Sequence, residues 1–152
     1  MHQDYPCFPH EKDTMIASTI HFDDCADRKR GVRVVPGSHT GGLLAWHKRA
    51  EESNLLTSGQ HVDGEIDESV AVDMELAAGQ MSLHHTHAVH GSNPNCGSDR
   101  RLGFCASFIP TRVHQFGDHR STAMLVRGVD EFGHFAPEFP PTGDADARSR
   151  AE

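Results

Sequence analysis

The stretch MSLHHTHAVHGSNPN, residues 81–95, is the most informative segment for the fold. Residues 81–89 show no helical repeat of apolar positions, and the turn-forming residues 91–95 follow them directly. A short run that stops at Gly, Asn and Pro is typical of a β-strand that ends in a turn. We therefore predict a strand over 81–89.

The same stretch is unusually rich in histidine. The chain has 13 histidines, and four of them fall between positions 84 and 90. Imidazoles on an otherwise apolar strand are costly to bury without polar partners, so a metal ligand is the simplest explanation for at least one. His90 is the preferred candidate because it stands at the end of the predicted strand, beside Gly91.

Further strands are predicted on both sides of this segment. They cover residues 15–22, 32–35, 70–76 and 102–109, each closed by Gly, Pro or charged residues. Several short strands with few helices indicate a sandwich or a barrel. Residues 45–54 are expected to form a short helix, and the acidic stretch 63–68 a surface loop over the barrel mouth.

The composition excludes several classes of protein. The 152 residues carry 14 basic and 22 acidic side chains, a net charge of -8, so we expect no binding to nucleic acid or to an anionic membrane. We expect no transmembrane helix and no signal peptide. The four cysteines include no CxxC pair, which argues against a Cys-rich zinc site and indicates reduced thiols in a cytoplasmic protein.

A candidate metal site combines the N-terminus with the histidine-rich stretch. In His2-Gln3-Asp4, alternation along a strand places His2 and Asp4 on one face, while Gln3 points away. With His90 they form a set of two histidines and one carboxylate, which suits octahedral Fe(II) and leaves positions open for a 2-oxo acid and dioxygen. Zinc is the alternative metal.

A candidate anion site follows the candidate ligand His90. Arg101 lies 11 residues later, at the start of the next predicted strand, and we expect that strand to return antiparallel beside the first. Its guanidinium could then clamp a carboxylate, with Ser92 adding a hydroxyl. Arg100 is the competing choice, but Arg101 shares its predicted face with small neighbours that leave room for a ligand.

Several motifs, in order, resemble the phytanoyl-CoA dioxygenase family of Fe(II)/2-oxoglutarate oxygenases. They are residues 2–6, 22–24, 32–39, 76–80, His85, 90–95, Arg101 and 125–130. The resemblance covers about residues 1–135. It implies a double-stranded β-helix, or jelly roll, in which His2, Asp4 and His90 hold iron. It also implies that Arg101 and Ser92 hold 2-oxoglutarate as cosubstrate.

The resemblance implies an activity as well. A dioxygenase of this family uses dioxygen to hydroxylate a small-molecule substrate and releases succinate and CO2. The carboxylate Asp4 is retained, unlike in the related halogenases, so hydroxylation is the implied outcome. Relatives often carry a tryptophan near the position of Thr19. Thr19 and His21 are therefore predicted to shape a more polar substrate pocket, together with His85.

The sequence also departs from the family. Relatives carry roughly a hundred residues before the H-x-D triplet, so we expect an N-terminally truncated jelly roll. We predict a core over residues 1–136 and a flexible tail over 137–152. Two alternatives stay open: a truncated or inactive metal-binding jelly roll without turnover, and a cupin-like zinc or manganese enzyme.

Overall fold

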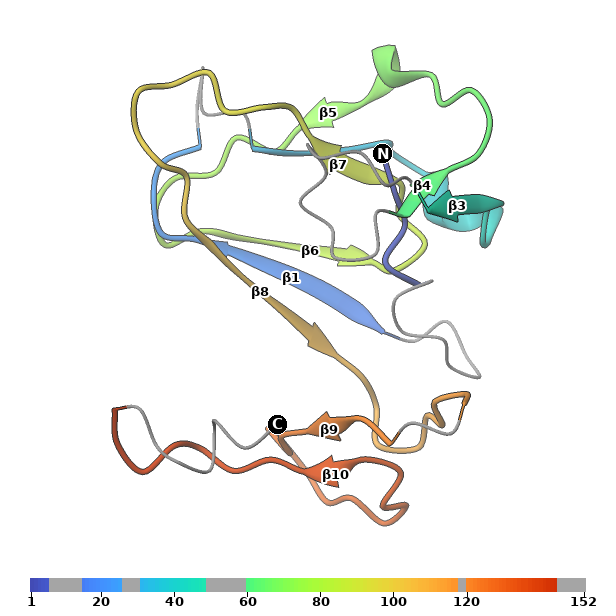
Figure 1. Cartoon of the computed structure of the whole chain (residues 1–152), viewed down its shortest axis with the longest axis vertical. Coiled ribbons are helices and arrows are strands. Elements are labelled where there is room, and N and C mark those ends of the chain that lie inside the picture. The colour runs from blue at the N-terminus through green and yellow to red at the C-terminus, as the bar shows by residue number, and fades with distance from the viewer. Residues whose placement is uncertain (6–14, 26–30, 49–59, 118–119, 145–152) are drawn as a thin grey trace.

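Two three-stranded antiparallel sheets form the body of the molecule (Figure 1). The computed structural model describes residues 1–5, 15–25, 31–48, 60–117 and 120–144. The first sheet has the order β6-β1-β8, with β6 at Met81–His85, β1 at Ile16–His21 and β8 at Gly103–Phe108. The second has the order β5-β2-β7, with β5 at Val72–Asp73, β2 at Val32–Val34 and β7 at His90–Ser92. The predicted double-stranded β-helix is confirmed.

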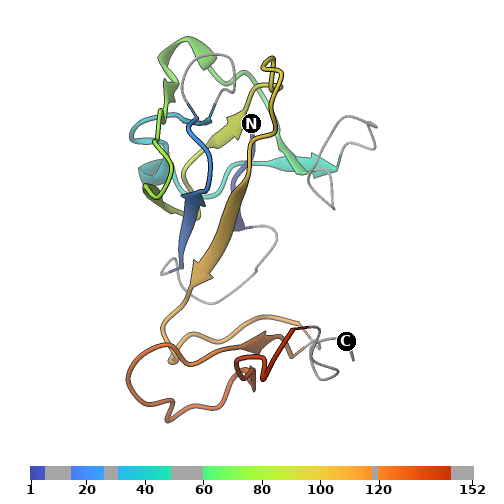
Figure 2. The same ribbon diagram turned by 90° about the vertical axis from the view of Figure 1, so that its left-hand side faces the viewer.

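Smaller elements surround the two sheets. A two-stranded ribbon pairs β3 (Trp46–Lys48) with β4 (Gln60–Val62), and 3-10 turns span η3 (Ser38–Gly41) and η4 (Glu68–Val70). Beyond β8, the parallel pair β9 (Thr122–Ala123) and β10 (Ala136–Pro137) lies apart from both sheets (Figures 1 and 2). Among the described residues, no helix has the length and apolar character needed to cross a membrane.

The register of β1 separates the two faces of the first sheet. Ala17 lies opposite His84 on β6, whereas Ile16 lies opposite His85. Side chains of opposed residues share a face, so the inward face carries Ala17, Thr19 and His21, all buried. The outward face carries Ile16, which is exposed. The inward face is therefore available to build a site.

The predicted strand over 81–89 is wrong in one respect, because the chain turns within it. Strand β6 ends at His85, and the amide of Ala88 donates to the carbonyl of His85 at 2.8 Å to close the turn. The carbonyl of Thr86 accepts from the amide of Asp4, far away in sequence. His90 thus begins the next strand, β7, instead of ending the first.

The predicted helix over 45–54 is also wrong where the structure describes it. Trp46 pairs with Val62 and Lys48 with Gln60, so cross-strand hydrogen bonds determine this segment and override its local helix preference. Residues 49–54 lie outside the described residues. The predicted boundary at residue 136 falls within β10, and the last eight residues of the predicted tail, 145–152, are not described either.

The buried interior of the described residues is more polar than apolar. Seven hydrophobic side chains are buried, and they are Met15, Ala17, Cys25, Val62, Ala88, Val89 and Val113. Nine polar ones are buried, and they are Gln3, Ser18, Thr19, His21, Gln60, Ser82, Thr86, His87 and His90. Buried polar groups need partners or a function, so this interior has the composition of a binding site.

Candidate metal centre

The N-terminal segment lies antiparallel to the chain that leads into β7. The amide of His2 donates to the carbonyl of His90 at 2.8 Å, and the amide of His90 donates back to His2 at 3.0 Å. The amide of Asp4 donates to the carbonyl of Thr86 at 2.9 Å. These backbone bonds fix two side chains of the H-x-D triplet beside His90, although more than 80 residues separate them in sequence.

Gln3 anchors this segment from its opposite face. Its side chain is buried, and its amide nitrogen donates to the carbonyls of Gly42 at 2.9 Å and His87 at 2.7 Å. Its amide oxygen accepts from the amide of Leu44 at 2.9 Å. The expected alternation is therefore present: His2 and Asp4 point to the site, and Gln3 points away.

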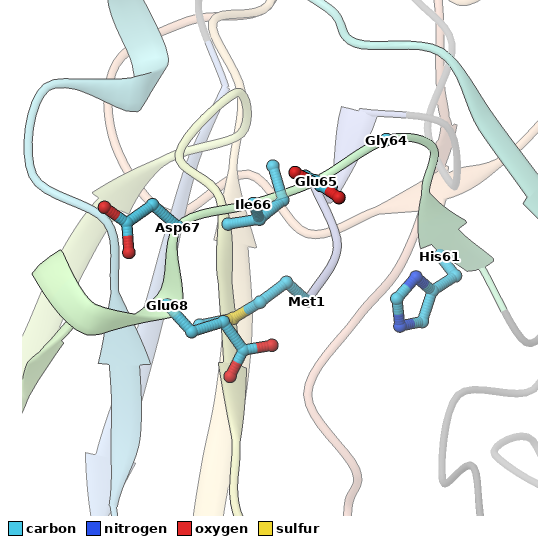
Figure 3. A pocket seen from close by; sticks show the side chains of 7 residues that line it. All are labelled: Met1, His61, Gly64, Glu65, Ile66, Asp67 and Glu68. Atoms are coloured by element: carbon cyan, nitrogen blue, oxygen red, sulfur yellow. The ribbon is translucent and has the colours of Figure 1, made fainter.

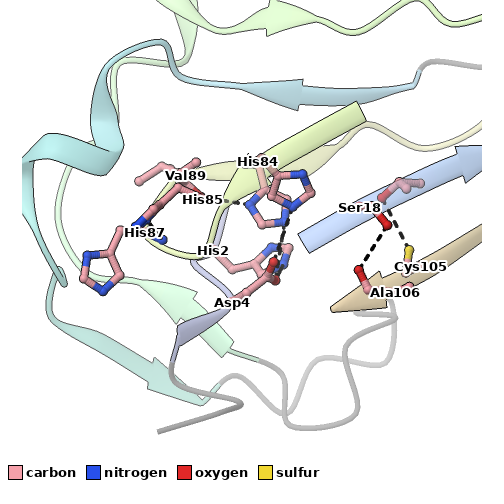
Figure 4. Close-up of polar contacts among 12 residues, drawn as sticks. His2, Asp4, Ser18, His84, His85, His87, Val89, Cys105 and Ala106 are labelled. Atoms are coloured by element: carbon pink, nitrogen blue, oxygen red, sulfur yellow. Dashed lines mark hydrogen bonds and ion pairs between the residues drawn. The ribbon is translucent and has the colours of Figure 1, made fainter. Parts of the chain in front are cut away.

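Three potential ligand atoms converge at the site (Figure 4). One atom from each of His2, Asp4 and His90 lies within 4.8 Å of the others. Oδ1 of Asp4 is 3.4 Å from Nε2 of His2 and 3.5 Å from Nε2 of His90. Adjacent ligands of an octahedral metal stand about 3 Å apart when the bonds are about 2.1 Å, so a small inward shift suffices for binding.

The protonation of His90 suits a ligand. Its Nδ1 lies 2.9 Å from the carbonyl of Ala88, and only an N–H at Nδ1 can donate there, which leaves the Nε2 lone pair facing Asp4. Burial, with a smaller contribution from the charge of His2, lowers the pKa of His90 to about 4. The imidazole is therefore neutral near pH 7, as metal binding requires.

Asp4 is held as an anion. Burial raises the pKa of this carboxyl, but hydrogen bonds from His2 and His84 lower it, and the nearby charges of His90 and His2 lower it further. The net effect places the pKa of Asp4 well below its usual range. An ionised carboxylate beside two imidazoles is a donor set that fits Fe(II) and also other divalent cations.

His84 is a functional candidate that the sequence reasoning did not assign. Its Nε2 lies 3.3 Å from Oδ2 of Asp4, and its ring centroid is 4.5 Å from that of His90. Figure 4 shows His84 and His2 both directed at the carboxylate of Asp4. Strand alternation could have separated His84 from its neighbour His85, but only the pairing with β1 shows which of them faces inward.

Arg101 and Ser92 are brought together, but not by the route expected. Strand β8 pairs with β1 in the other sheet and does not return beside β7, because the intervening loop crosses between the sheets. Nη2 of Arg101 nevertheless donates to Oγ of Ser92 at 3.4 Å. Ser92 and His90 are two residues apart on β7, so their side chains share a face of the strand.

The three predicted pocket residues do not lie on one face. Thr19 and His21 are both buried on the inward face of β1, and Nδ1 of His21 is 2.5 Å from Sγ of Cys25. Burial, followed by the positive charge of Arg101, lowers the pKa of His21. His21 pairs with Gly103 on β8, two residues from Arg101, so it lies near the candidate anion site. His85 belongs to the outward face by register, and its ring lies 5.9 Å from that of His39.

A separate cavity of about 560 Å³ opens beside the N-terminus (Figure 3). It is lined by Met1, His61, Gly64, Glu65, Ile66, Asp67 and Glu68. The expected acidic surface loop thus forms its wall, and the loop residues 63–65 and 67–68 are exposed. Of the lining residues, Met1 is the chain neighbour of the candidate ligand His2.

Comparison with known proteins agrees with a jelly-roll fold that carries a metal site. Residues 1–103 match the family "Phytanoyl-CoA dioxygenase (PhyH)". The chain is 28% identical over 135 residues to the "Probable alpha-ketoglutarate-dependent hypophosphite dioxygenase" of Stutzerimonas stutzeri, covering 84% of this chain and 46% of that protein. The chain belongs to the phytanoyl-CoA dioxygenase family, as its motifs predicted.

Solved structures show the same architecture. The apo form of the non-heme monooxygenase ThoJ is similar with a TM-score of 0.82 and 30% identity, covering 98% of this chain and 53% of that chain. The epimerase SnoN, solved with Fe3+ and alpha ketoglutarate, shares the fold at a TM-score of 0.59 and 21% identity, covering 94% of this chain and 54% of that chain. The chain therefore spans about half the length of the relatives it matches.

Proposed function

We propose that the chain carries the metal centre of an Fe(II)/2-oxoglutarate-dependent dioxygenase that hydroxylates a small-molecule substrate. The observation that carries the proposal is the convergence of His2, Asp4 and His90, one ligand atom each, within 4.8 Å. Two imidazoles and one carboxylate occupy one face of an octahedron and leave the opposite face open. The resemblance to a protein named as an alpha-ketoglutarate-dependent dioxygenase supports the same assignment.

In this proposal three side chains bind the metal, and the surrounding protein orients them. His2, Asp4 and His90 hold the metal, and the hydrogen bond from Nδ1 of His90 to the carbonyl of Ala88 fixes its ring. When bound, the iron supplies the activation of dioxygen, coupled to decarboxylation of 2-oxoglutarate to succinate and CO2. The protein contributes orientation, and a largely buried interior that limits the access of water.

Arg101 and Ser92 bind the distal carboxylate of 2-oxoglutarate in this proposal. A guanidinium and a hydroxyl already in contact offer a charge and a directional donor to the same anion. Their position favours this role, since Ser92 stands two residues after His90 on the same strand face. The cosubstrate can then reach the metal with its other end.

Thr19 and His21 are proposed to line the space for substrate, next to the cosubstrate. Both are buried on the inward face of β1, and His21 lies close enough to Arg101 for its pKa to respond to that charge. His85 stays a proposed pocket residue on the other face of the sheet, beside His39. A cytoplasmic location is proposed as well, supported by the free thiols of Cys96 and Cys105.

The test measures binding and turnover separately. The chain is loaded with Fe(II) without oxygen, titrated with 2-oxoglutarate, and then exposed to oxygen while succinate release is followed. Asp4→Ala should abolish metal binding and succinate release, because it removes the only carboxylate of the candidate ligand set. Asp63→Asn, which changes an exposed carboxylate outside the candidate ligand set, is the matched control and should leave both unchanged.

Two outcomes would contradict the proposal. Metal binding that survives Asp4→Ala would show that the metal binds elsewhere. Metal binding that depends on Asp4, but without any binding or decarboxylation of 2-oxoglutarate, would replace the dioxygenase with a metal-binding jelly roll that has no turnover.

A further inference from the structure

The carboxylate of Asp4 is divided between two sets of partners. Its Oδ1 faces Nε2 of His2 at 3.4 Å and Nε2 of His90 at 3.5 Å. Its Oδ2 faces Nε2 of His84 at 3.3 Å. One oxygen is therefore directed to the candidate metal position, and the other is held from behind by a histidine that has no assigned role.

We propose that His84 is a positioning residue that holds Oδ2 of Asp4 and presents Oδ1 alone to the metal. This inference rests on the proposed function, since it takes His2, Asp4 and His90 as the metal ligands. His84 itself stays outside the coordination shell. In the part of the chain that the structure describes, the group of ligand atoms within 4.8 Å of one another does not include it.

The surroundings of His84 favour this role over a solvent-facing one. The side chain is 8% exposed, and it lies on the inward face of β6, opposite Ala17 of β1. Its Nδ1 is buried without a hydrogen-bond partner among the described residues. The polar contact of this imidazole is therefore made through Nε2 to Asp4, and the strand pairing fixes the direction of the ring.

The proton arrangement follows from the partner. An ionised carboxylate only accepts hydrogen bonds, so Nε2 of His84 must carry the hydrogen that it shares with Oδ2. A bare Nδ1 leaves no buried N–H unsatisfied, whereas the other tautomer would bury an N–H without an acceptor. Both considerations select the Nε2–H form.

The consequence for a metal centre is control over the number of open positions. A carboxylate with two free oxygens can bind one cation through both and occupy two sites, whereas a hydrogen bond to Oδ2 favours binding through Oδ1 alone. Groups that hydrogen-bond to a metal-ligating carboxylate commonly orient that carboxylate. Removing such a group costs about 10–100-fold in metal affinity or activity. We expect the same range for loss of the His84 contact.

The experiment titrates Co²⁺ into the metal-free chain and records affinity by calorimetry and coordination by visible absorption. His84→Phe removes the donor and keeps a planar ring of similar size. In His84→Gln the side-chain nitrogen can take the place of Nε2, whereas the shorter side chain of His84→Asn places its nitrogen near Nδ1 instead. His114→Phe, which changes a histidine that contacts His134 in the C-terminal segment, is the matched control.

The expected result is a graded loss of Co²⁺ affinity. The visible spectrum at saturation should change in His84→Phe and His84→Asn, because the released Oδ2 can join Oδ1 on the metal, and should stay as in the wild type in His84→Gln. His84→Phe and His84→Asn should bind about 10–100-fold more weakly, and His84→Gln should recover most of the loss. Thermal unfolding of the metal-free variants identifies any that do not fold. If His84→Phe does not fold, the comparison of Gln with Asn, which differ by one methylene, gives the same answer.

Three results would overturn the inference. Equal Co²⁺ affinity of wild type and His84→Phe would remove the positioning role while leaving the ligand set intact. An altered spectrum in every His84 variant, without rescue by Gln, would make His84 a ligand itself. A wild-type chain that binds no Co²⁺ would overturn both this inference and the proposed function. The first result overturns the inference alone, so the two failures can be told apart.

Discussion

At the scale of single residues, position and contact separate the two neighbouring arginines. Arg101 contacts Ser92, and its charge lowers the pKa of His21, whereas Arg100 is exposed in the loop. Arg101→Ala should weaken binding of 2-oxoglutarate by about 1.5–3 kcal/mol, the usual loss for a hydrogen bond to a charged group. Calorimetric titration of the metal-loaded chain measures this loss.

The control for this prediction is Arg100→Ala, which should leave the affinity for 2-oxoglutarate unchanged. Metal binding should persist in both variants, because neither side chain belongs to the ligand set. The opposite pattern, with a loss only in Arg100→Ala, would transfer the anion-binding role to Arg100.

The residues that sequence reasoning could place are those whose geometry is local. His2 and Asp4 share a face because they stand two apart in an extended segment, and this follows from their spacing alone. Which histidine among His84, His85 and His87 faces Asp4 depends on the register of β6 against β1, where Ala17 lies opposite His84. That register is a long-range property, so the contact of His84 was not predictable from spacing.

At the scale of elements, the N-terminal segment is held by a buried side chain as well as by its own backbone. Gln3 is buried and binds three backbone groups, in Gly42, Leu44 and His87. Gln3→Met keeps a similar volume but leaves these groups without that partner, so we expect a loss of about 1–3 kcal/mol in the free energy of unfolding. Urea unfolding with and without Co²⁺ measures this loss.

The same variant should also lower the affinity for Co²⁺, since Gln3 stands between His2 and Asp4 and orders both. Gln80→Met is the control, because the side chain of Gln80 is exposed and its Oε1 accepts from the nearby amide of Ala77. Unchanged stability in Gln3→Met would mean that the backbone bonds of His2 and Asp4 suffice to hold the segment.

The pairing of β2 with β5 depends on a glycine. A Cβ on Gly31 would stand 2.5 Å from the carbonyl oxygen of Met74, whose amide donates to Val32 at 2.8 Å. Gly31→Ala must therefore displace backbone, and we expect a destabilisation of about 1–3 kcal/mol in thermal or urea unfolding. Gly41→Ala, where a Cβ meets nothing within 4 Å, is the control and should change stability little.

The elements themselves show where sequence patterns reach their limit. Strands β1, β2 and β8 appear close to their predicted ranges, because apolar runs and turn residues mark them locally. The break between β6 and β7 is set by hydrogen bonds from Asp4 and Tyr5 to Thr86, and β3 is set by its pairing with β4. In both cases the hydrogen-bonding partners lie elsewhere in the sequence. The sequence of the segment alone therefore does not predict the break or the strand.

At the scale of the whole molecule, the outward face of the sheet β6-β1-β8 is apolar and exposed. Ile16 is 45% exposed, Leu83 60%, Phe104 54% and Phe108 47%, and the register places them on one face. Contiguous exposed apolar surface binds hydrophobic dyes and favours association of folded chains. We therefore predict that the chain binds such a dye in its native state and scatters more light as its concentration rises.

The double variant Leu83→Lys with Phe104→Lys should reduce both signals. Leu83 and Phe104 stand on β6 and β8, the edge strands of the described sheet, where lysine also opposes strand-to-strand pairing. Since both side chains are already largely exposed, stability should change by no more than about 0.5 kcal/mol per site. Val129→Lys, which charges a 75% exposed residue outside the sheets, is the control. Dye binding that responds equally to the control and to the double variant would show that this face is not the source of the signal.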